Sequence, residues 1–412
     1  MVGRKALILI GDGMGDRPVP ELGGRTPLEA ARRPNLDRVA REGECGLMDP
    51  IAPGVRAGSD TSHLAILGYD PFECYTGRGP FEALGIGMEV KPGDIAFRCN
   101  FATVDENLVV LDRRAGRIRE GTDQLARALN EEIGEIEGVR CIVKESVEHR
   151  AALILRGEGL GDRVSDVDPH ETGVRIHDAE GEDEPSRRTA RILNEFVRRS
   201  YEVLRKHPVN AERERKGLLP ANILLPRGAG RAPHLEPFER RFGLKAAMVA
   251  EVGLIKGIGR YLGMTVPDVP GATGSHDTDV EAIARATLEM LEGHDFVLVN
   301  LKAPDVGGHD QDPETKIKDI ELMDKLVGLI LDGLDASQVY VVLTADHSTP
   351  ISVGDHSGDP APIAIMGPDV RRDDVSEFTE RACSKGGLCR IRGRDILPIL
   401  TNLMGVQEKF GA

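Results

Sequence analysis

Short runs of aliphatic and β-branched residues alternate along the chain with longer stretches whose apolar positions recur at helical spacing. The predicted buried strands are Lys5–Ile10, Ala246–Val249, Phe296–Leu301, Val339–Leu343 and Pro362–Met366. Between them, Thr278–Leu291 and Lys316–Leu334 have the apolar stripe of amphipathic helices. Strands that alternate with helices predict an α/β fold, in which helices sandwich a mainly parallel sheet.

The middle of the chain has a different pattern, richer in charge. Its predicted elements are strands around Asp94–Phe101 and Ala151–Leu155 and helices around Thr122–Ile133 and Ser186–Lys206. We therefore expect residues 88–231 to form an inserted, smaller α+β cap domain, and residues 1–87 and 232–412 to form the core domain. A length of 412 residues also favours about two domains.

Composition narrows the classes of function. A formal net charge of −15 argues against a nucleic-acid binder, which needs clustered Lys and Arg. No apolar stretch approaches the roughly 20 residues that span a bilayer, so neither a membrane protein nor a membrane partner is expected. Six cysteines without CxxC spacing indicate no zinc knuckle. We expect a cytoplasmic protein that acts on a small molecule, and the sequence is compatible with a homo-oligomer.

Metal-type ligands follow two of the predicted strands. Asp346 and His347 end one strand, Asp305 and His309 follow another, and His356 lies on the next loop. The carboxyl ends of strands are where open α/β sheets hold their active sites. A single Asp or His there is more often a capping or solvated residue, but two such pairs would gather negative charge without a cation. The set therefore predicts a metal centre, with two ions favoured.

Two further residues could join this centre. Asp12 lies between Gly11 and Gly13 after the first strand, where a sharp turn would expose its carboxylate. Ser59 follows a glycine at the start of a short predicted helix, where backbone N–H groups favour an anion and a hydroxyl can act as a nucleophile. The alternative for Ser59 is an ordinary N-cap, a role that Ser62 could also fill.

The order of these residues resembles the alkaline phosphatase superfamily, and most of all the archaeal type of 2,3-bisphosphoglycerate-independent phosphoglycerate mutases. The resemblance covers nearly the whole chain, and it is most specific where Pro304-Asp305 and Gly308-His309 are combined with Ala345-Asp346-His347. The other segments that carry it are Gly11–Asp16, Ser59–Leu64, Tyr75–Pro80, Asn222–Gly230 and Gly253–Gly263. It implies an alkaline-phosphatase-like fold.

The resemblance also implies how the ligands are shared. Asp305, His309 and His356 would hold one divalent ion, and the other would be held by Asp12, Ser59, Asp346 and His347. Family members commonly use manganese, with zinc, magnesium or cobalt in some, and carboxylates mixed with imidazoles suit manganese or zinc better than magnesium. Alignment on His63-Leu64 makes Ser59 the nucleophile, with Ser62 as its rival.

The implied activity is the interconversion of 3-phosphoglycerate and 2-phosphoglycerate in glycolysis and gluconeogenesis, through a phosphoserine intermediate at a two-metal site. The alternatives are a metal-dependent phosphomonoesterase, another phosphomutase, or a metal-binding protein without turnover whose insertion binds a partner. The candidate substrate residues are Lys256, Arg114, Arg117, Asp168 and His170. Asp166, Asp168 and His170 are candidates for the general acid and base.

Overall fold

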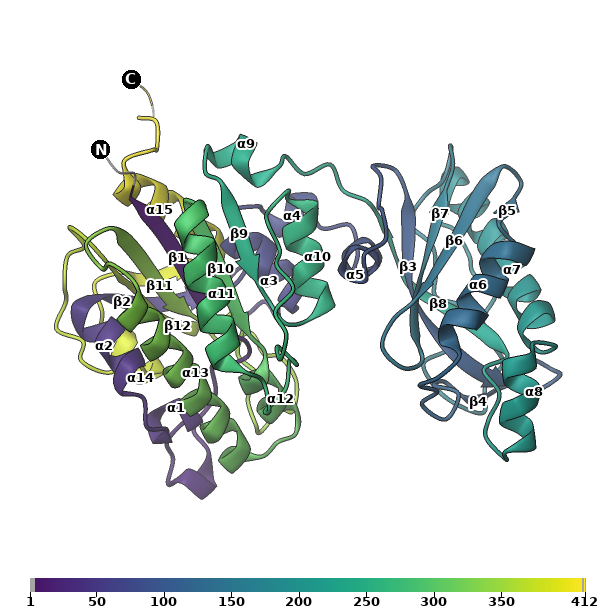
Figure 1. Ribbon diagram of the computed structural model, residues 1–412, viewed down its shortest axis with the longest axis horizontal. Helices are drawn as coiled ribbons and strands as arrows, with labels where there is room; N and C mark the ends of the chain where they lie inside the picture. The colour runs from purple at the N-terminus through teal and green to yellow at the C-terminus, as the bar shows by residue number, and fades with distance from the viewer. Residues whose placement is uncertain (1–3, 410, 412) are drawn as a thin grey trace. The chain divides into compact units, whose positions relative to one another are not determined.

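The computed structural model describes residues 4–409 and 411 (Figure 1). The chain divides into two compact units, one of which comprises the described residues of Met1–Cys74 and Leu235–Ala412. The other is Tyr75–His234, which lies between the two parts of the first unit in the sequence. Within the described part of the chain, no helix is both long and apolar enough to cross a membrane.

A seven-stranded sheet forms the centre of the first unit, with the order β13-β2-β12-β11-β1-β10-β9. Its strands are β1 (Lys5–Gly11), β2 (Gly43–Asp49), β9 (Ala246–Val249), β10 (Phe296–Leu301), β11 (Val339–Thr344), β12 (Ala361–Met366) and β13 (Cys389–Arg392). Only β12 runs against its neighbours, so the predicted mainly parallel sheet is confirmed. Strands β10 and β11 are buried throughout, which explains their unbroken apolar runs.

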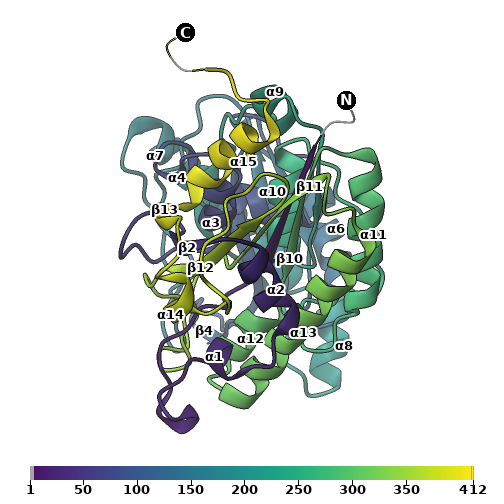
Figure 2. The ribbon, with the colours of Figure 1, turned by 90° about the vertical axis from the view of Figure 1, so that its left-hand side faces the viewer.

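Helices cover both faces of this sheet (Figure 2). Helices α2, α11 and α13 contact one another or the strands on one face, while α3, α10 and α15 belong to the other. The helices of this unit are α1 (Pro27–Ala30), α2 (Pro34–Glu42), α3 (Ser59–Ile66), α4 (Pro71–Cys74), α9 (Phe238–Phe242), α10 (Gly253–Tyr261), α11 (Val280–Gly293), α12 (Ala303–His309), α13 (Pro313–Gly333), α14 (Glu380–Cys383) and α15 (Ile396–Met404). Two 3₁₀ turns, η1 (Pro20–Leu22) and η2 (Gly393–Asp395), complete it.

The second unit is built on a six-stranded antiparallel sheet, β4-β3-β7-β6-β5 with β8 paired to β3. Its strands are β3 (Ile95–Val104), β4 (Val110–Asp112), β5 (Glu135–Ile136), β6 (Val139–Glu145), β7 (Arg150–Arg156) and β8 (Ile223–Arg231). Its helices are α5 (Gly79–Gly85), α6 (Thr122–Glu132), α7 (Glu184–Leu204) and α8 (Pro208–Arg215).

The two faces of this sheet carry different side chains because successive residues of a strand point to opposite faces. Ile95 and Phe97 join the apolar core beneath α6 and α7, whereas Ala96 belongs to a smaller core that contains Ala83 of α5. Helix α5 therefore belongs with the insertion, although the sequence pattern placed residues up to 87 in the core domain. The predicted strands and long helices are all present, whereas β2, β4, β5, β6, β8 and β13 were not predicted.

Candidate metal centre

Three neighbouring strands of the first unit carry ligand-type side chains at their carboxyl ends. Asp12 follows β1 directly, and Asp346 and His347 follow β11, which pairs with β1 in parallel. On the other side of β1, β10 leads into α12, which carries Asp305 and His309. The sequence showed these last two only as residues after a strand. The short helix places them four residues apart and therefore on one face.

The first group of ligands is Asp12, Asp346 and His347, and all three side chains are fully buried. The Nε2 atom of His347 lies 3.6 Å from Oδ1 of Asp12 and 3.3 Å from Oδ2 of Asp346. The Asp346 Oδ2 atom is buried and receives no hydrogen bond from any residue that the structure describes. An orphaned buried carboxylate oxygen is costly unless a cation meets it, so this group fits a metal ion.

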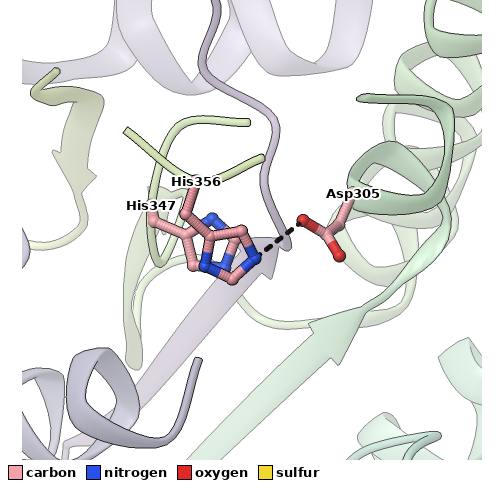
Figure 3. A group of neighbouring side chains, drawn as sticks. All are labelled: Asp305, His347 and His356. Atoms are coloured by element: carbon pink, nitrogen blue, oxygen red, sulfur yellow. Dashed lines mark ion pairs between the residues drawn. The ribbon is translucent and has the colours of Figure 1, made fainter. Parts of the chain in front are cut away.

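The second group is Asp305, His356 and again His347 (Figure 3). The rings of His347 and His356 stack with centroids 3.6 Å apart, and the carboxylate of Asp305 points toward them. Nε2 of His356 lies 3.5 Å from Oδ1 of Asp305, and Nε2 of His309 lies 3.5 Å from Oδ2. A third possible group joins His309 and His356 to Asp355. His347 is thus shared, which the division implied by the resemblance did not foresee.

The imidazoles of all three histidines are oriented in the same way. Nδ1 of His356 donates to the carbonyl oxygen of Ala57, at 2.9 Å, and Nδ1 of His309 donates to that of Gly354, at 3.0 Å. Nδ1 of His347 lies 3.1 Å from Oγ1 of Thr349, a hydroxyl that itself donates to Asp305. In each ring it is Nε2 that faces the carboxylates, which is the usual arrangement of metal-binding histidines.

Burial and neighbouring charges shift the pKa values in this centre. Burial, together with the charge of Asp12, raises the pKa of Asp346 to about 7. Burial lowers the pKa of His347 to about 4. Burial would also raise the pKa of Asp305, but the ammonium of Lys302 holds it well below its usual range. Three carboxylates, those of Asp12, Asp305 and Asp346, thus gather in a low-dielectric site around one ammonium, which favours a further cation.

Ser59 is the first residue of α3 and lies beside the ligands. Its Oγ is 3.1 Å from Nε2 of His347, while its carbonyl oxygen accepts a hydrogen bond from Nδ1 of His63 at 2.7 Å. The rival hydroxyl, Ser62 Oγ, donates instead to the carbonyl oxygen of Gly58 at 2.9 Å. The geometry therefore favours Ser59 over Ser62 as the hydroxyl at the centre.

Sequence reasoning missed several polar residues that contact the ligands. Lys302 Nζ donates to Oδ1 of Asp12 at 2.8 Å and forms an ion pair with Asp305 at 2.6 Å. Nδ2 of Asn300 lies 2.9 Å from Asp12 Oδ2 and 3.2 Å from Nε2 of His63, so it links β1 to α3. The sequence signal that could have indicated them is the position of Asn300 and Lys302, two polar residues at the end of an apolar strand and close to the proposed ligand Asp305.

The predicted substrate residues of the insertion are brought together only in part. Asp168 is fully buried and accepts two hydrogen bonds from Arg113, at 2.9 and 2.6 Å. Nδ1 of His170 lies 3.3 Å from Arg113 Nη2 and 3.5 Å from Arg227 Nη1. Arg114 and Arg117, the two predicted arginines, are exposed. Arg113, which the sequence analysis did not select, is the arginine that donates these hydrogen bonds to Asp168.

Arg98 and Arg227 lie near Arg113, and we call these three residues the arginine cluster. Arg98 and Arg227 lie directly opposite each other on β3 and β8, on the face of the sheet that carries Ala96. Like charges in this position destabilise a sheet. The nearest carboxylates compensate them at long range only: Glu82 lies 3.8 Å from Arg98 and Asp168 lies 3.9 Å from Arg227. Nε of each guanidinium is buried and has no hydrogen-bond partner among the described residues. Burial lowers the pKa of Arg98 to about 10, so the cluster favours an anionic ligand.

The remaining candidates have other contacts. Lys256, on α10, pairs with the exposed Asp268 at 3.5 Å, and its role in substrate binding stays a prediction. Asp166 lies 2.9 Å from Nε2 of His170, which fixes that ring toward the arginine cluster.

Comparison with known proteins decides the family. Residues 40–210 match the family model described as 2,3-bisphosphoglycerate-independent phosphoglycerate mutase. The mutase 1 of this kind from Methanothermobacter thermautotrophicus is 58% identical over 99% of this chain and 100% of its own length. The chain belongs to this family. The mutase of Methanopyrus kandleri is 55% identical over 99% of this chain and 98% of its own length.

Solved structures of similar proteins confirm the fold of this phosphoglycerate mutase family member. A protein of Pyrococcus horikoshii is 43% identical, covers 100% of both chains and has a TM-score of 0.88. The cofactor-independent phosphoglycerate mutase of Thermoplasma acidophilum is 37% identical, over 98% of this chain and 100% of that one, with a TM-score of 0.76. Residues 194–357 match the type I phosphodiesterase / nucleotide pyrophosphatase model. The predicted alkaline-phosphatase-like α/β fold with a smaller α+β unit is confirmed.

Proposed function

We propose that this chain interconverts 3-phosphoglycerate and 2-phosphoglycerate through a phosphoserine at Ser59, beside two divalent ions. The observation that carries the proposal is the 3.1 Å approach of Ser59 Oγ to His347 Nε2, within a fully buried group of ligands. A serine that only capped its helix would not need this position. The interconversion of the two phosphoglycerates is the function of the family, and the cytoplasm is the proposed place of this glycolytic step.

The donor atoms fit two neighbouring ions, because His347 belongs to two of the ligand groups. In this proposal Asp12, Ser59, Asp346 and His347 would hold one ion, and Asp305, His309 and His356 would hold the other. Imidazoles mixed with carboxylates favour manganese, with zinc as the nearest alternative and magnesium or cobalt as further ones. When bound, such ions polarise phosphoryl oxygens and favour ionisation of the serine hydroxyl.

The chemistry then requires two displacements at phosphorus. In the first, Ser59 Oγ forms a bond to phosphorus while the ester bond to glycerate breaks, and the departing oxygen gains a proton as the serine loses one. In the second, the other hydroxyl of glycerate attacks the phosphoserine and Ser59 regains its proton. No atom is gained or lost over the cycle, so the phosphoryl group changes position without release of phosphate.

Residues of the insertion are proposed to bind the anionic substrate and to move its proton. The guanidinium groups of Arg98 and Arg227, whose buried Nε atoms have no hydrogen-bond partner among the described residues, support a role in anion binding. Arg113 is their neighbour. Burial tends to raise the pKa of Asp168, but Arg113 lowers it below the usual value, which makes Asp168 a poor proton donor. His170, with half of its side chain exposed, is the better candidate for the general acid and base.

Phosphorus NMR of the manganese-loaded protein with 3-phosphoglycerate tests the proposal. We expect 2-phosphoglycerate without inorganic phosphate, and loss of this product in Ser59→Ala. Ser62→Ala is the matched control, because this hydroxyl bonds to Gly58 and not to the ligands. Inorganic phosphate as the main product would favour a phosphomonoesterase, an alternative that the match to the phosphodiesterase model keeps open. An unchanged Ser59→Ala variant would refute the assigned nucleophile.

A further inference from the structure

Lys302 joins the two groups of metal ligands. Its Nζ lies 2.8 Å from Oδ1 of Asp12, which belongs to the first group, and 2.6 Å from Oδ2 of Asp305, which belongs to the second. The lysine side chain is 18% exposed, whereas those of Asp12 and Asp305 are 0% and 3% exposed. The ammonium therefore compensates two deeply buried carboxylates.

Hydrogen bonds to Glu251 hold the backbone of Lys302 in place. Its N–H donates to Oε2 of Glu251 at 2.6 Å, and Oε1 of Glu251 accepts from the Gly274 N–H at 3.1 Å and from the Thr278 hydroxyl. Burial is the main cause that raises the pKa of Glu251. These contacts fix the start of α12, from which a flexible four-carbon stem carries the ammonium.

A divalent ion and the ammonium compete for the same oxygen atoms. An ion bonded to Asp12 or Asp305 would lie within a few ångströms of Nζ, where two positive charges in a buried site repel strongly. The ammonium is carried by a stem of four rotatable methylene groups and is partly open to solvent, while the ligand carboxylates are fixed by a strand end and a short helix.

We propose that Lys302 is a tethered counter-ion that exchanges with the metal ions at Asp12 and Asp305. Before the ions bind, its ammonium neutralises the two carboxylates and stabilises the folded core. When the ions bind, the ammonium withdraws from these oxygens, and the cost of this withdrawal sets the affinity for metal. The inference rests on the metal centre of the proposed function. It assigns Lys302 the role of a counter-ion, although Lys302 is not one of the proposed metal ligands.

Titration calorimetry with Mn²⁺ on the chelator-treated full chain tests the exchange. We expect Lys302→Gln to bind Mn²⁺ at least tenfold more tightly than the unaltered protein. The metal-free variant should also melt roughly 5 °C lower, with the difference removed by saturating Mn²⁺. Lys325→Gln is the matched control, because it removes a lysine that pairs with Glu281 at the surface, and it should change neither quantity.

Lysine acetylation followed by mass spectrometry gives a second readout on the unaltered protein. Lys302 should be protected without metal and become reactive when Mn²⁺ is bound. Lys316 is fully buried against Asp16 and should stay protected in both states, whereas Lys325 should react in both. Protection of Lys302 in both states would overturn the exchange, as would unchanged or weaker Mn²⁺ binding by Lys302→Gln. Failure of the unaltered protein to bind Mn²⁺ would overturn the metal centre as well.

Discussion

The ligand centre of the core unit and the arginine cluster of the insertion are both groups of polar side chains, but they differ in burial, in charge and in the elements that carry them. Asp12, Asp346 and His347 follow the ends of parallel strands and are fully buried. Arg98 and Arg227 extend from neighbouring antiparallel strands, and their side chains are 22% exposed. One group is short, rigid and acidic, whereas the other is long, adaptable and basic.

This difference matches what each group is proposed to bind. A metal ion needs donors at nearly fixed bond lengths, and short side chains on strand ends provide them. A substrate that must arrive, turn and leave is better met by long guanidinium side chains, which bind carboxylate and phosphate oxygens in several geometries. The negative net charge of the chain is thus compatible with an anionic substrate, because positive charge is gathered locally.

Removal of metal should have the largest effect on mutase activity. If it had none, the contrast between a metal centre and an anion site would be wrong. We expect a chelator to lower the mutase activity by at least about 10³-fold, and added Mn²⁺ to restore it. The antiparallel sheet of the insertion contains none of the predicted ligands, so far-ultraviolet circular dichroism should change little. Full activity in the chelated protein would show that the strand-end ligands do not form a catalytic metal centre.

Asp305→Asn should reduce both Mn²⁺ affinity and kcat/KM by more than about 10²-fold. Removal of a residue that only hydrogen-bonds to a metal ligand already costs up to about 10²-fold, and Asp305 is proposed as a ligand itself. The physical reason is the loss of the carboxylate that faces His356, His309 and Lys302. Asp310→Asn is the control, since it changes an exposed carboxylate on the same segment. Calorimetry and steady-state kinetics measure the two quantities. Equal losses in both variants would contradict a specific role for Asp305.

Arg227→Met tests the other side of the comparison. We expect KM for 3-phosphoglycerate to rise about 10- to 100-fold with a smaller change in kcat, because one charge-assisted contact is lost. Arg163→Met in the same unit should leave KM unchanged, since Arg163 pairs with Asp183 at the surface. Arg114→Met should also have little effect, as this side chain is exposed. A larger effect of Arg114 than of Arg227 would favour the residues chosen from the sequence.

The candidate ligands could be grouped from the sequence because they follow strands closely. Parallel strands with unbroken apolar runs are easy to recognise, and their carboxyl ends meet at one edge, so Asp12, Asp305 and Asp346 could be grouped without a structure. The sharing of His347 between two groups could not be predicted, because it depends on the stacking of two rings. Lys302 was missed because a lysine beside a ligand has no distinctive spacing.

The arginine cluster could not be predicted in the same way. Arg98 and Arg227 are far apart in the sequence and meet through the register of β3 and β8, and β8 was not predicted. Long side chains also leave the choice among neighbouring arginines open, so the sequence alone did not distinguish Arg114 and Arg117 from Arg113, which hydrogen-bonds to Asp168. Such a site depends on strand pairing, which local pattern does not determine.

The smallest predicted effect concerns the stability of the folded chain in acid. It tests whether a buried histidine of the insertion stays neutral beside arginines. Burial, followed by the charges of Arg150 and Arg114, lowers the pKa of His149 to about 4. The unfolded chain takes up this proton below about pH 6.5 but the folded chain does not, so folding stability falls as the pH drops from 6.5 towards 4. His149→Gln should reduce this fall by about 2 kcal/mol in urea unfolding of the manganese-loaded protein between pH 6.5 and 4.5. Parallel pH profiles for the variant and the unaltered protein would mean that the folded chain does not hold His149 neutral, against the effect of its burial and of the neighbouring Arg150 and Arg114.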